Sequence, residues 1–139
     1  MTLFEQLKAL PKVNLHINLT SSISTNLLFD LSNEENIIDL EDKLVPNNNR
    51  EYRESLNLPL RVLKSHKNID LAINDLIDRL EKNNIIYTEL FLDIPLYKNI
   101  DEEKLISYVL EVINSRKANI NLVLCLSSTF TKEENLETD

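Results

Sequence analysis

The chain has 139 residues, a formal net charge of −8 and a sequence pI near 4.8. A domain of this length can bury a core of useful size. So acidic a chain offers no basic stripe for phosphate backbones, and nucleic acids and anionic membranes are not expected as partners. Its single cysteine cannot form an internal disulfide, which favours a reducing, cytoplasmic compartment. With no glycine, the chain lacks the glycine-rich loops that bind nucleotide phosphates, and we expect asparagine to close several turns.

The N-terminal region predicts a short helix followed by a strand. Residues 2–9 have the spacing of a capping box, with Thr2 followed by Glu5, and Pro11 ends that helix. The segment is too polar for a signal peptide. Residues 13–19 alternate apolar and polar side chains, as a strand with two different faces does. We expect Val13, Leu15, Ile17 and Leu19 to face helices, and Asn14, His16 and Asn18 to lie on the opposite face.

The next segment predicts a helix, a loop and an irregular helical stretch. Ser24 or a neighbouring serine has the position of an N-cap for a short helix that runs to Leu31. Residues 33–50 are acidic and then rich in asparagine, which predicts a mobile loop. Helical spacing resumes over residues 51–65 and is interrupted at Pro59.

The remaining pattern predicts two helices that alternate with two further strands. Residues 69–80 have apolar side chains at helical spacing, and Asp101 is expected to cap the later helix. Residues 84–94 and 120–127 read as strands, and residues 129–139 as a polar tail. No apolar run is long enough to cross a membrane. The alternation of helices and strands predicts an α/β fold with a parallel sheet.

Strand periodicity also predicts which side chains share a face. On the second strand it groups Tyr87, Glu89, Phe91 and Asp93, and on the third it groups Asn121, Val123, Cys125 and Ser127. Polar groups near the carboxyl ends of parallel strands mark the place where ligands bind. A lone histidine on a strand is nevertheless more often a structural residue than a metal ligand.

Several motifs resemble the adenosine deaminase family of metal-dependent hydrolases. The segment LPKVNLHINLTSS (residues 10–22) is similar to the family's opening L-P-K-x-E-L-H-x-H-L-D-G-S, and residues 58–63 are similar to L-P-L-K-V-L. Residues 87–89 match Y-x-E on the family's second strand. Residues 124–125 and 133–138 are similar to the third strand and the acidic helix start that follows it. The resemblance therefore covers most of the chain.

This resemblance implies a (β/α)₈ barrel and a zinc-dependent hydrolytic deamination of adenosine to inosine, a reaction of purine salvage. In the family, two strand-1 histidines, a later histidine and a late aspartate hold zinc, which activates a water. Residues 1–139 would be the N-terminal segment of such a barrel, with about three parallel strands and flanking helices. An entire barrel of this type needs about 250 residues, so the remaining family positions would lie beyond residue 139.

The family's functional positions are only partly retained. His16 matches the first zinc histidine, whereas Asn18 stands at the second metal position and offers only a neutral amide oxygen. Thr20 replaces the aspartate that helps to hold the ribose, which makes it a degenerate substrate-binding position. Glu89 is a retained candidate for substrate binding, although an Asn or Arg partner that satisfies this carboxylate is an equal alternative.

Other positions of the family pattern are replaced as well. Phe91 stands where the family has an arginine, and Ser127 and Ser128 stand where it has an arginine and a histidine. His66 lies among lysines in a solvated segment and is not expected to bind metal. Cys125 is expected to be a small buried apolar residue.

These observations predict a truncated adenosine deaminase-like protein that is inactive alone and whose zinc binding is weak or absent. One alternative is a deaminase fragment that a second chain completes. Another is a non-catalytic module that binds adenosine, a related nucleoside or a protein. Exposed sheet edges make a complementing chain or self-association plausible under each of these interpretations.

Overall fold

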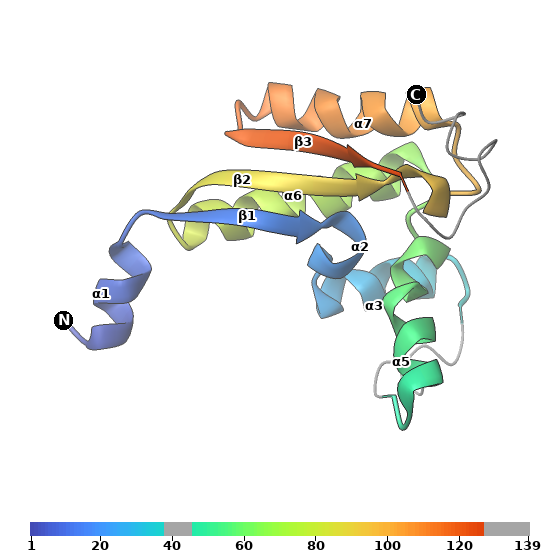
Figure 1. Cartoon of the computed structure of the whole chain (residues 1–139), viewed down its shortest axis with the longest axis horizontal. Helices are drawn as coiled ribbons and strands as arrows, with labels where there is room; N and C mark the ends of the chain where they lie inside the picture. Colours follow the sequence, from blue (N-terminus) through green and yellow to red (C-terminus); the bar gives the residue numbers. More distant parts are fainter. Residues whose placement is uncertain (38–45, 127–139) are drawn as a thin grey trace.

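Three parallel strands form one sheet in the order β1-β2-β3 (Figure 1). The computed structural model describes residues 1–37 and 46–126. The strands are β1 (Lys12–Asn18), β2 (Ile85–Asp93) and β3 (Ile120–Cys125). The predicted α/β fold, with about three parallel strands and flanking helices, is therefore confirmed. Residues 38–45 and 127–139, which include Ser127, Ser128 and the expected polar tail, lie outside the described residues.

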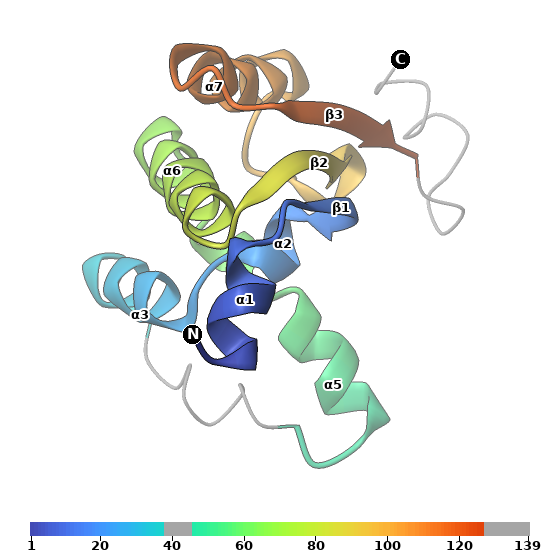
Figure 2. The same ribbon diagram turned by 90° about the vertical axis from the view of Figure 1, so that its left-hand side faces the viewer.

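Two long helices cover the same face of this sheet (Figure 2). Helix α6 (His66–Lys82) connects β1 to β2, and α7 (Glu102–Ser115) connects β2 to β3. The Asp101 carboxylate accepts a hydrogen bond from the backbone N–H of Lys104, as expected for its N-cap. Both connections are therefore crossovers of the kind that parallel strands require.

The core lies between these helices and one face of β2. Thr88, Leu90 and Leu92 alternate along β2 and are buried, whereas the residues between them are half-buried. From the helices, the core receives the apolar positions that the sequence spacing predicts, namely Ile69, Ile73, Leu76, Leu80, Leu105, Val109, Val112 and Ile113. Burial of β2 by both helices thus fixes which of its faces is left uncovered.

Helix α1 (Leu3–Ala9) precedes β1 and has hydrogen-bonded ends. The expected capping box is present, because the Thr2 backbone N–H donates to Glu5 Oε2 at 2.6 Å and the Glu5 N–H donates to Thr2 Oγ1 at 3.2 Å. At the other end, Lys12 Nζ donates to the carbonyls of Leu7, Lys8 and Leu10 at 2.9, 3.0 and 2.7 Å. Within the described part of the chain, α1 has no buried side chain.

Shorter elements follow β1 and link it to α6. They are α2 (Leu19–Ser22), α3 (Thr25–Glu34), α5 (Asn49–Leu56) and the 3₁₀ helix η1 (Leu58–Arg61). Ser24 caps α3 as expected, although α3 runs three residues beyond the predicted end at Leu31. The loop predicted over 33–50 was too long at both ends, since α3 and α5 each extend into it. Pro59 lies in η1, at the predicted interruption.

Turns between these elements use asparagine where the backbone becomes left-handed. Asn36 and Asn84 have φ values of 55° and 54°, and Lys117 has a φ of 51°. Asparagine tolerates this region better than most residues, so a chain without glycine can still close its turns. Among the described residues, no helix combines the length and apolar character that a bilayer-spanning segment requires.

Replacing Leu90 with alanine is expected to lower the free energy of unfolding by about 2–5 kcal/mol, because it opens a cavity between β2 and both helices. Leu110→Ala on α7 is the matched control, since that side chain is 38% exposed and should cost much less. Urea denaturation followed by circular dichroism measures both. Equal losses would contradict a core centred on β2.

Candidate functional site

A β-bulge in β1 decides which residues of the first strand reach the uncovered face. Asn14 pairs with Thr88, and Ile17 pairs with Leu90. Between these two pairs β1 advances by three residues and β2 by only two, so β1 contains one extra residue. Asn14 is therefore on the helix side, while Val13 and Leu15 are 56% and 57% exposed and lie outside the core. The strict alternation predicted for residues 13–19 was wrong for Asn14, Val13 and Leu15. The extra residue reverses which face of the sheet the side chains before it point to.

His16 lies at this bulge and turns its ring to the uncovered face. Its imidazole is centred 4.2 Å from the ring of Phe91, with the planes tilted by 37°. The backbone N–H of His16 donates to Asn14 Oδ1 at 3.1 Å. Phe91 thus provides the ring contact of His16.

Asn18 and Thr20 lie where β1 ends and α2 begins. Asn18 is opposite Phe91 in the strand register and occupies the N-cap of α2, although its side chain makes no capping hydrogen bond. Leu19, expected on the strand, is the first residue of α2 and is buried. Thr20 is half-buried within α2. The expected metal and ribose positions therefore adjoin one another at the carboxyl end of β1.

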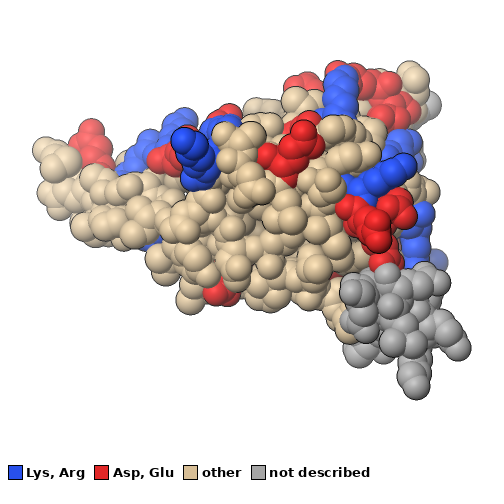
Figure 3. Space-filling view, turned by 90° about the horizontal axis from the view of Figure 1, so that it is seen from above, with Lys and Arg blue, Asp and Glu red and all other residues tan. Residues whose placement is uncertain are grey.

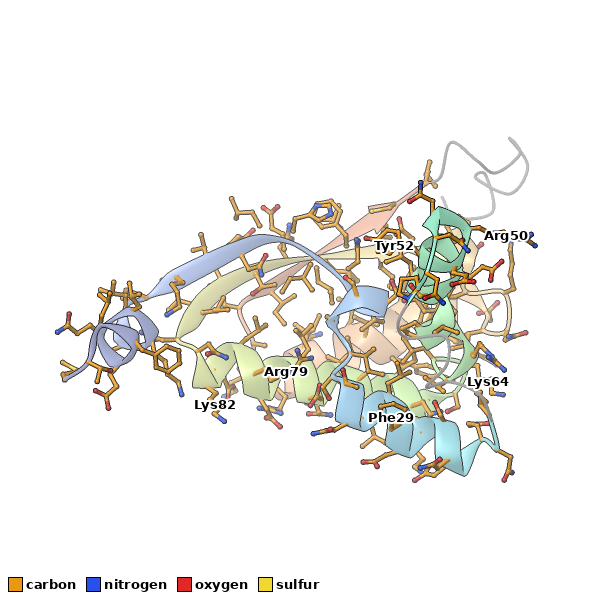
Figure 4. All side chains as sticks on the ribbon, turned by 90° about the horizontal axis from the view of Figure 1, so that it is seen from below. Phe29, Arg50, Tyr52, Lys64, Arg79 and Lys82 are labelled. Carbon is orange, nitrogen blue, oxygen red and sulfur yellow. The ribbon has the colours of Figure 1, made fainter. Side chains whose placement is uncertain are left out.

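Helix α2 is held in place by α6. The Arg79 guanidinium donates to the backbone carbonyl of Ser22 and also binds Asp75 Oδ2, with 2.9 Å between that oxygen and Nη2. Figure 4 shows Arg79 on α6, which packs against the covered face of the sheet. A hollow of about 330 Å³ lies between β1 and α6, and Asn14 and Arg79 are among its lining residues. Arg79 thereby fixes the end of β1 to the helix layer.

Glu89 lies on the uncovered face together with Tyr87 and Phe91. The Tyr87 hydroxyl donates to Glu89 Oε1 at 3.2 Å. Burial raises the pKa of Tyr87, and Glu89 adds to this increase because it accepts the hydroxyl proton. The alternative of an Asn or Arg partner for Glu89 was wrong, since tyrosine takes that place two residues earlier on the same strand face.

Asp93, Cys125 and Tyr97 form a second polar group, at the carboxyl ends of β2 and β3. Asp93 pairs with Cys125 in the strand register. Burial, followed by the nearby Asp93 carboxylate, raises the pKa of the Cys125 thiol. The same two causes raise the pKa of Tyr97, which is buried after the 3₁₀ helix η2 (Ile94–Leu96). Cys125 is half-buried, so it is less enclosed than expected.

Strand parity had grouped Asp93 with the other residues on its face, but it assigned Asp93 no part in the site. The missing information was the register between β2 and β3, which brings the carboxylate opposite the thiol. Tyr97 carried no sequence signal, because it follows the strand in a 3₁₀ turn whose path depends on packing.

The described residues do not fit a catalytic zinc centre. Such a centre takes three protein ligands from imidazole, thiolate or carboxylate, together with one open position. Within residues 1–37 and 46–126, no three His, Cys, Asp or Glu residues lie close enough to hold one metal ion. His16 offers one imidazole, and its neighbour Asn18 offers only an amide.

His66 occupies a different part of the molecule and has its own partners. Its ring stacks on Tyr108 of α7 with centroids 3.9 Å apart, and Nε2 lies 3.3 Å from Asp70 Oδ2 and 3.4 Å from Glu111 Oε2. These contacts join α6 to α7, so His66 has a structural role in this fold.

The chain is similar in sequence to two curated adenosine deaminases, although no family model matches it. It is 29% identical over 143 residues to an adenosine deaminase of Clostridium acetobutylicum, a match that covers 90% of this chain and 42% of that protein. An adenosine deaminase of Clostridium kluyveri is 26% identical, with 99% of this chain and 44% of that protein covered. The chain thus spans less than half the length of these curated relatives.

Solved structures share the fold. Arabidopsis ADAL in complex with GMP has a TM-score of 0.80 and 21% identity, and the match covers 96% of this chain and 46% of that one. The Arabidopsis N6-mAMP deaminase MAPDA has a TM-score of 0.78 over the same shares. An amidohydrolase of Burkholderia ambifaria with bound Zn has a TM-score of 0.66 and 13% identity, and covers 89% of this chain and 38% of its own.

Replacing Asp93 with asparagine is expected to speed alkylation of the Cys125 thiol by iodoacetamide at pH 8. Removing the carboxylate lowers the raised thiol pKa, so more reactive thiolate is present. Asp30→Asn on the exposed side of α3 is the control and should leave the rate unchanged. The rate is measured by mass spectrometry, and an unchanged rate in Asp93→Asn would refute the proposed contact.

Proposed function

We propose that this chain belongs to the adenosine deaminase family and forms an N-terminal portion of its barrel. By itself, this portion does not deaminate adenosine. The supporting observation is the site at the end of β1. There, His16 rests on Phe91 and its neighbour at the second metal position is Asn18.

The chemistry of hydrolytic deamination explains why this matters. In the family, a bound metal ion supplies an activated water at neutral pH. Three strands bring one imidazole to the uncovered face, and an amide oxygen is a poor ligand for zinc. Glu89, one of the two carboxylates that β2 brings to this face, already accepts a hydrogen bond from Tyr87. The apolar core that holds these positions is nevertheless complete around β2.

Purified chain is therefore expected to release no ammonia from adenosine and to contain well under one zinc ion per chain. Ammonia release is followed by a coupled assay, and metal content by elemental analysis. The Clostridium acetobutylicum adenosine deaminase serves as the active control. Stoichiometric zinc together with formation of inosine would overturn the proposal.

Substitution of Asn18 by histidine is expected to raise the affinity for Zn²⁺ by about tenfold or more, because it adds a second imidazole on the face that holds His16. Competition with a chromophoric chelator measures the affinity. Asn14→His is the matched control, since Asn14 lies on the helix side. Equal affinities in the two variants would show that position 18 is not the altered ligand position.

A second candidate function is the binding of a purine nucleoside without turnover, and the ring pair on the uncovered face favours it. The His16 and Phe91 rings lie at the carboxyl end of the strands, where parallel sheets bind ligands. Aromatic rings can stack with a planar base. The solved relative ADAL has been observed with GMP and with IMP.

Adenosine is expected to raise the melting temperature of the chain if this second function holds. Phe91→Leu should abolish the increase, because it removes the stacking ring and keeps an apolar side chain. Phe29→Leu on α3 is the control and should keep it. Differential scanning fluorimetry measures the shift, and an increase that survives Phe91→Leu would contradict stacking on this ring.

A further inference from the structure

We infer that Arg79, on the helix layer, is a positioning residue for the candidate site on the uncovered face of the sheet. It acts through α2, the single helical turn that contains Thr20 and begins directly after Asn18. The inference rests on the proposed function, because it takes positions 18 and 20 to be ligand-binding positions. Arg79 itself lies on the covered side of the sheet and acts only by holding α2.

Helix α2 needs support from the rest of the molecule. It has four residues, and one helical turn is unstable in water because its few hydrogen bonds do not offset the cost of ordering the backbone. At its first end, the strand register pairs Asn18 with Phe91, and Leu19 is buried in the core. These two contacts fix where α2 begins. Its other end, at Ser22, depends on different contacts.

A hollow of about 330 Å³ lies where this second end approaches α6. Both helices contribute to its lining, with Ser21 and Ser22 from α2 and with Leu76, Arg79, Leu80 and Asn83 from α6. Side chains that border an open space make fewer packing contacts than side chains in a filled core. Apolar packing against α6 is therefore a weak constraint on the orientation of α2 at this end.

A hydrogen bond from Arg79 supplies the constraint that packing does not. The guanidinium donates to the backbone carbonyl of Ser22, one of the carbonyls that the end of a helix leaves without an internal partner. Asp75, one turn earlier on α6, holds the guanidinium in place, because Nε and Nη2 lie 3.1 and 2.9 Å from Asp75 Oδ2. A guanidinium that is already oriented loses little further entropy when it binds Ser22.

The position of this end of α2 affects the residues that precede it. Thr20 lies between the two anchored ends, and Asn18 is the N-cap residue from which the turn starts (Figure 1). A rotation of the turn would carry Thr20 with it and would redirect the Asn18 side chain relative to His16. Arg79 thus sets the geometry of the uncovered face from the opposite side of the sheet.

Replacing Arg79 with methionine tests the inference, because it removes the guanidinium and keeps an apolar stem. In the Asn18→His variant, Arg79→Met is expected to cancel the gain of about tenfold in Zn²⁺ affinity, since the second imidazole loses its fixed direction. Asp75→Asn should cancel part of the gain, because it leaves the guanidinium in place but weakens its hold. Competition with a chromophoric chelator measures each affinity.

The matched control removes another guanidinium from the helix layer. Figure 3 shows Lys and Arg beside Asp and Glu along one rim of the molecule, so the loss of an ion pair could act on stability in general. Arg116 of α7 donates to Asn74, Asp78 and Glu81, all on α6. Arg116→Met therefore weakens the helix layer away from α2, and it should keep the gain in Zn²⁺ affinity.

Amide hydrogen exchange measures the hold on α2 without any metal ion. The peptide that spans residues 19–24 is expected to exchange about tenfold faster in Arg79→Met than in the unaltered chain, because a hydrogen bond from a charged group is lost. Peptides from β2 should keep their protection, which establishes that the variant is folded. Arg116→Met should leave the exchange of residues 19–24 unchanged.

Unchanged exchange of residues 19–24 in Arg79→Met, or a gain in Zn²⁺ affinity that survives this substitution, overturns the inference. Equal effects of Arg79→Met and Arg116→Met also overturn it, because the cause would then be a general weakening of the helix layer. If Asn18→His alone gives no gain, position 18 is not a metal position and the proposed function loses that support. The exchange of residues 19–24 then still decides whether Arg79 holds α2.

Discussion

Burial of one face of β2 beneath α6 and α7 is the constraint on which the rest of this structure depends. Leu90 and Leu92 are fully enclosed on that side, so the residues between them must point the other way. Glu89, Phe91 and Asp93 reach the uncovered face for this reason. The same packing holds β1 and β3 on either side of β2. It thereby fixes the positions of the polar side chains of the candidate site relative to one another.

The candidate site lies on a well-packed apolar frame, but the described residues do not form a metal centre there. The α6 and α7 positions that bury β2 are apolar throughout, and the caps at Ser65 and Asp101 are present. At the end of β1, by contrast, the ring of Phe91 lies beside His16. A ring contact of this kind stabilises the position of the histidine ring.

Local signals in the sequence predicted most of the elements. Capping residues such as Thr2, Ser24 and Asp101 act within one turn of helix, so their positions could be recognised from spacing alone. The side-chain partition of β2 was also correct, because strict alternation holds along a regular strand. Element ends were less exact, as at Leu19, where the strand gives way to α2.

The sequence by itself determined that this is a parallel α/β fold with flanking helices, since alternation and capping are properties of neighbouring residues. Only the tertiary structure decided that Val13 and Leu15 are uncovered, that His16 meets Phe91 and that Asp93 meets Cys125. The physical reason is strand register. One extra residue in β1 and the pairing of β2 with β3 depend on contacts between distant segments, which no local pattern records.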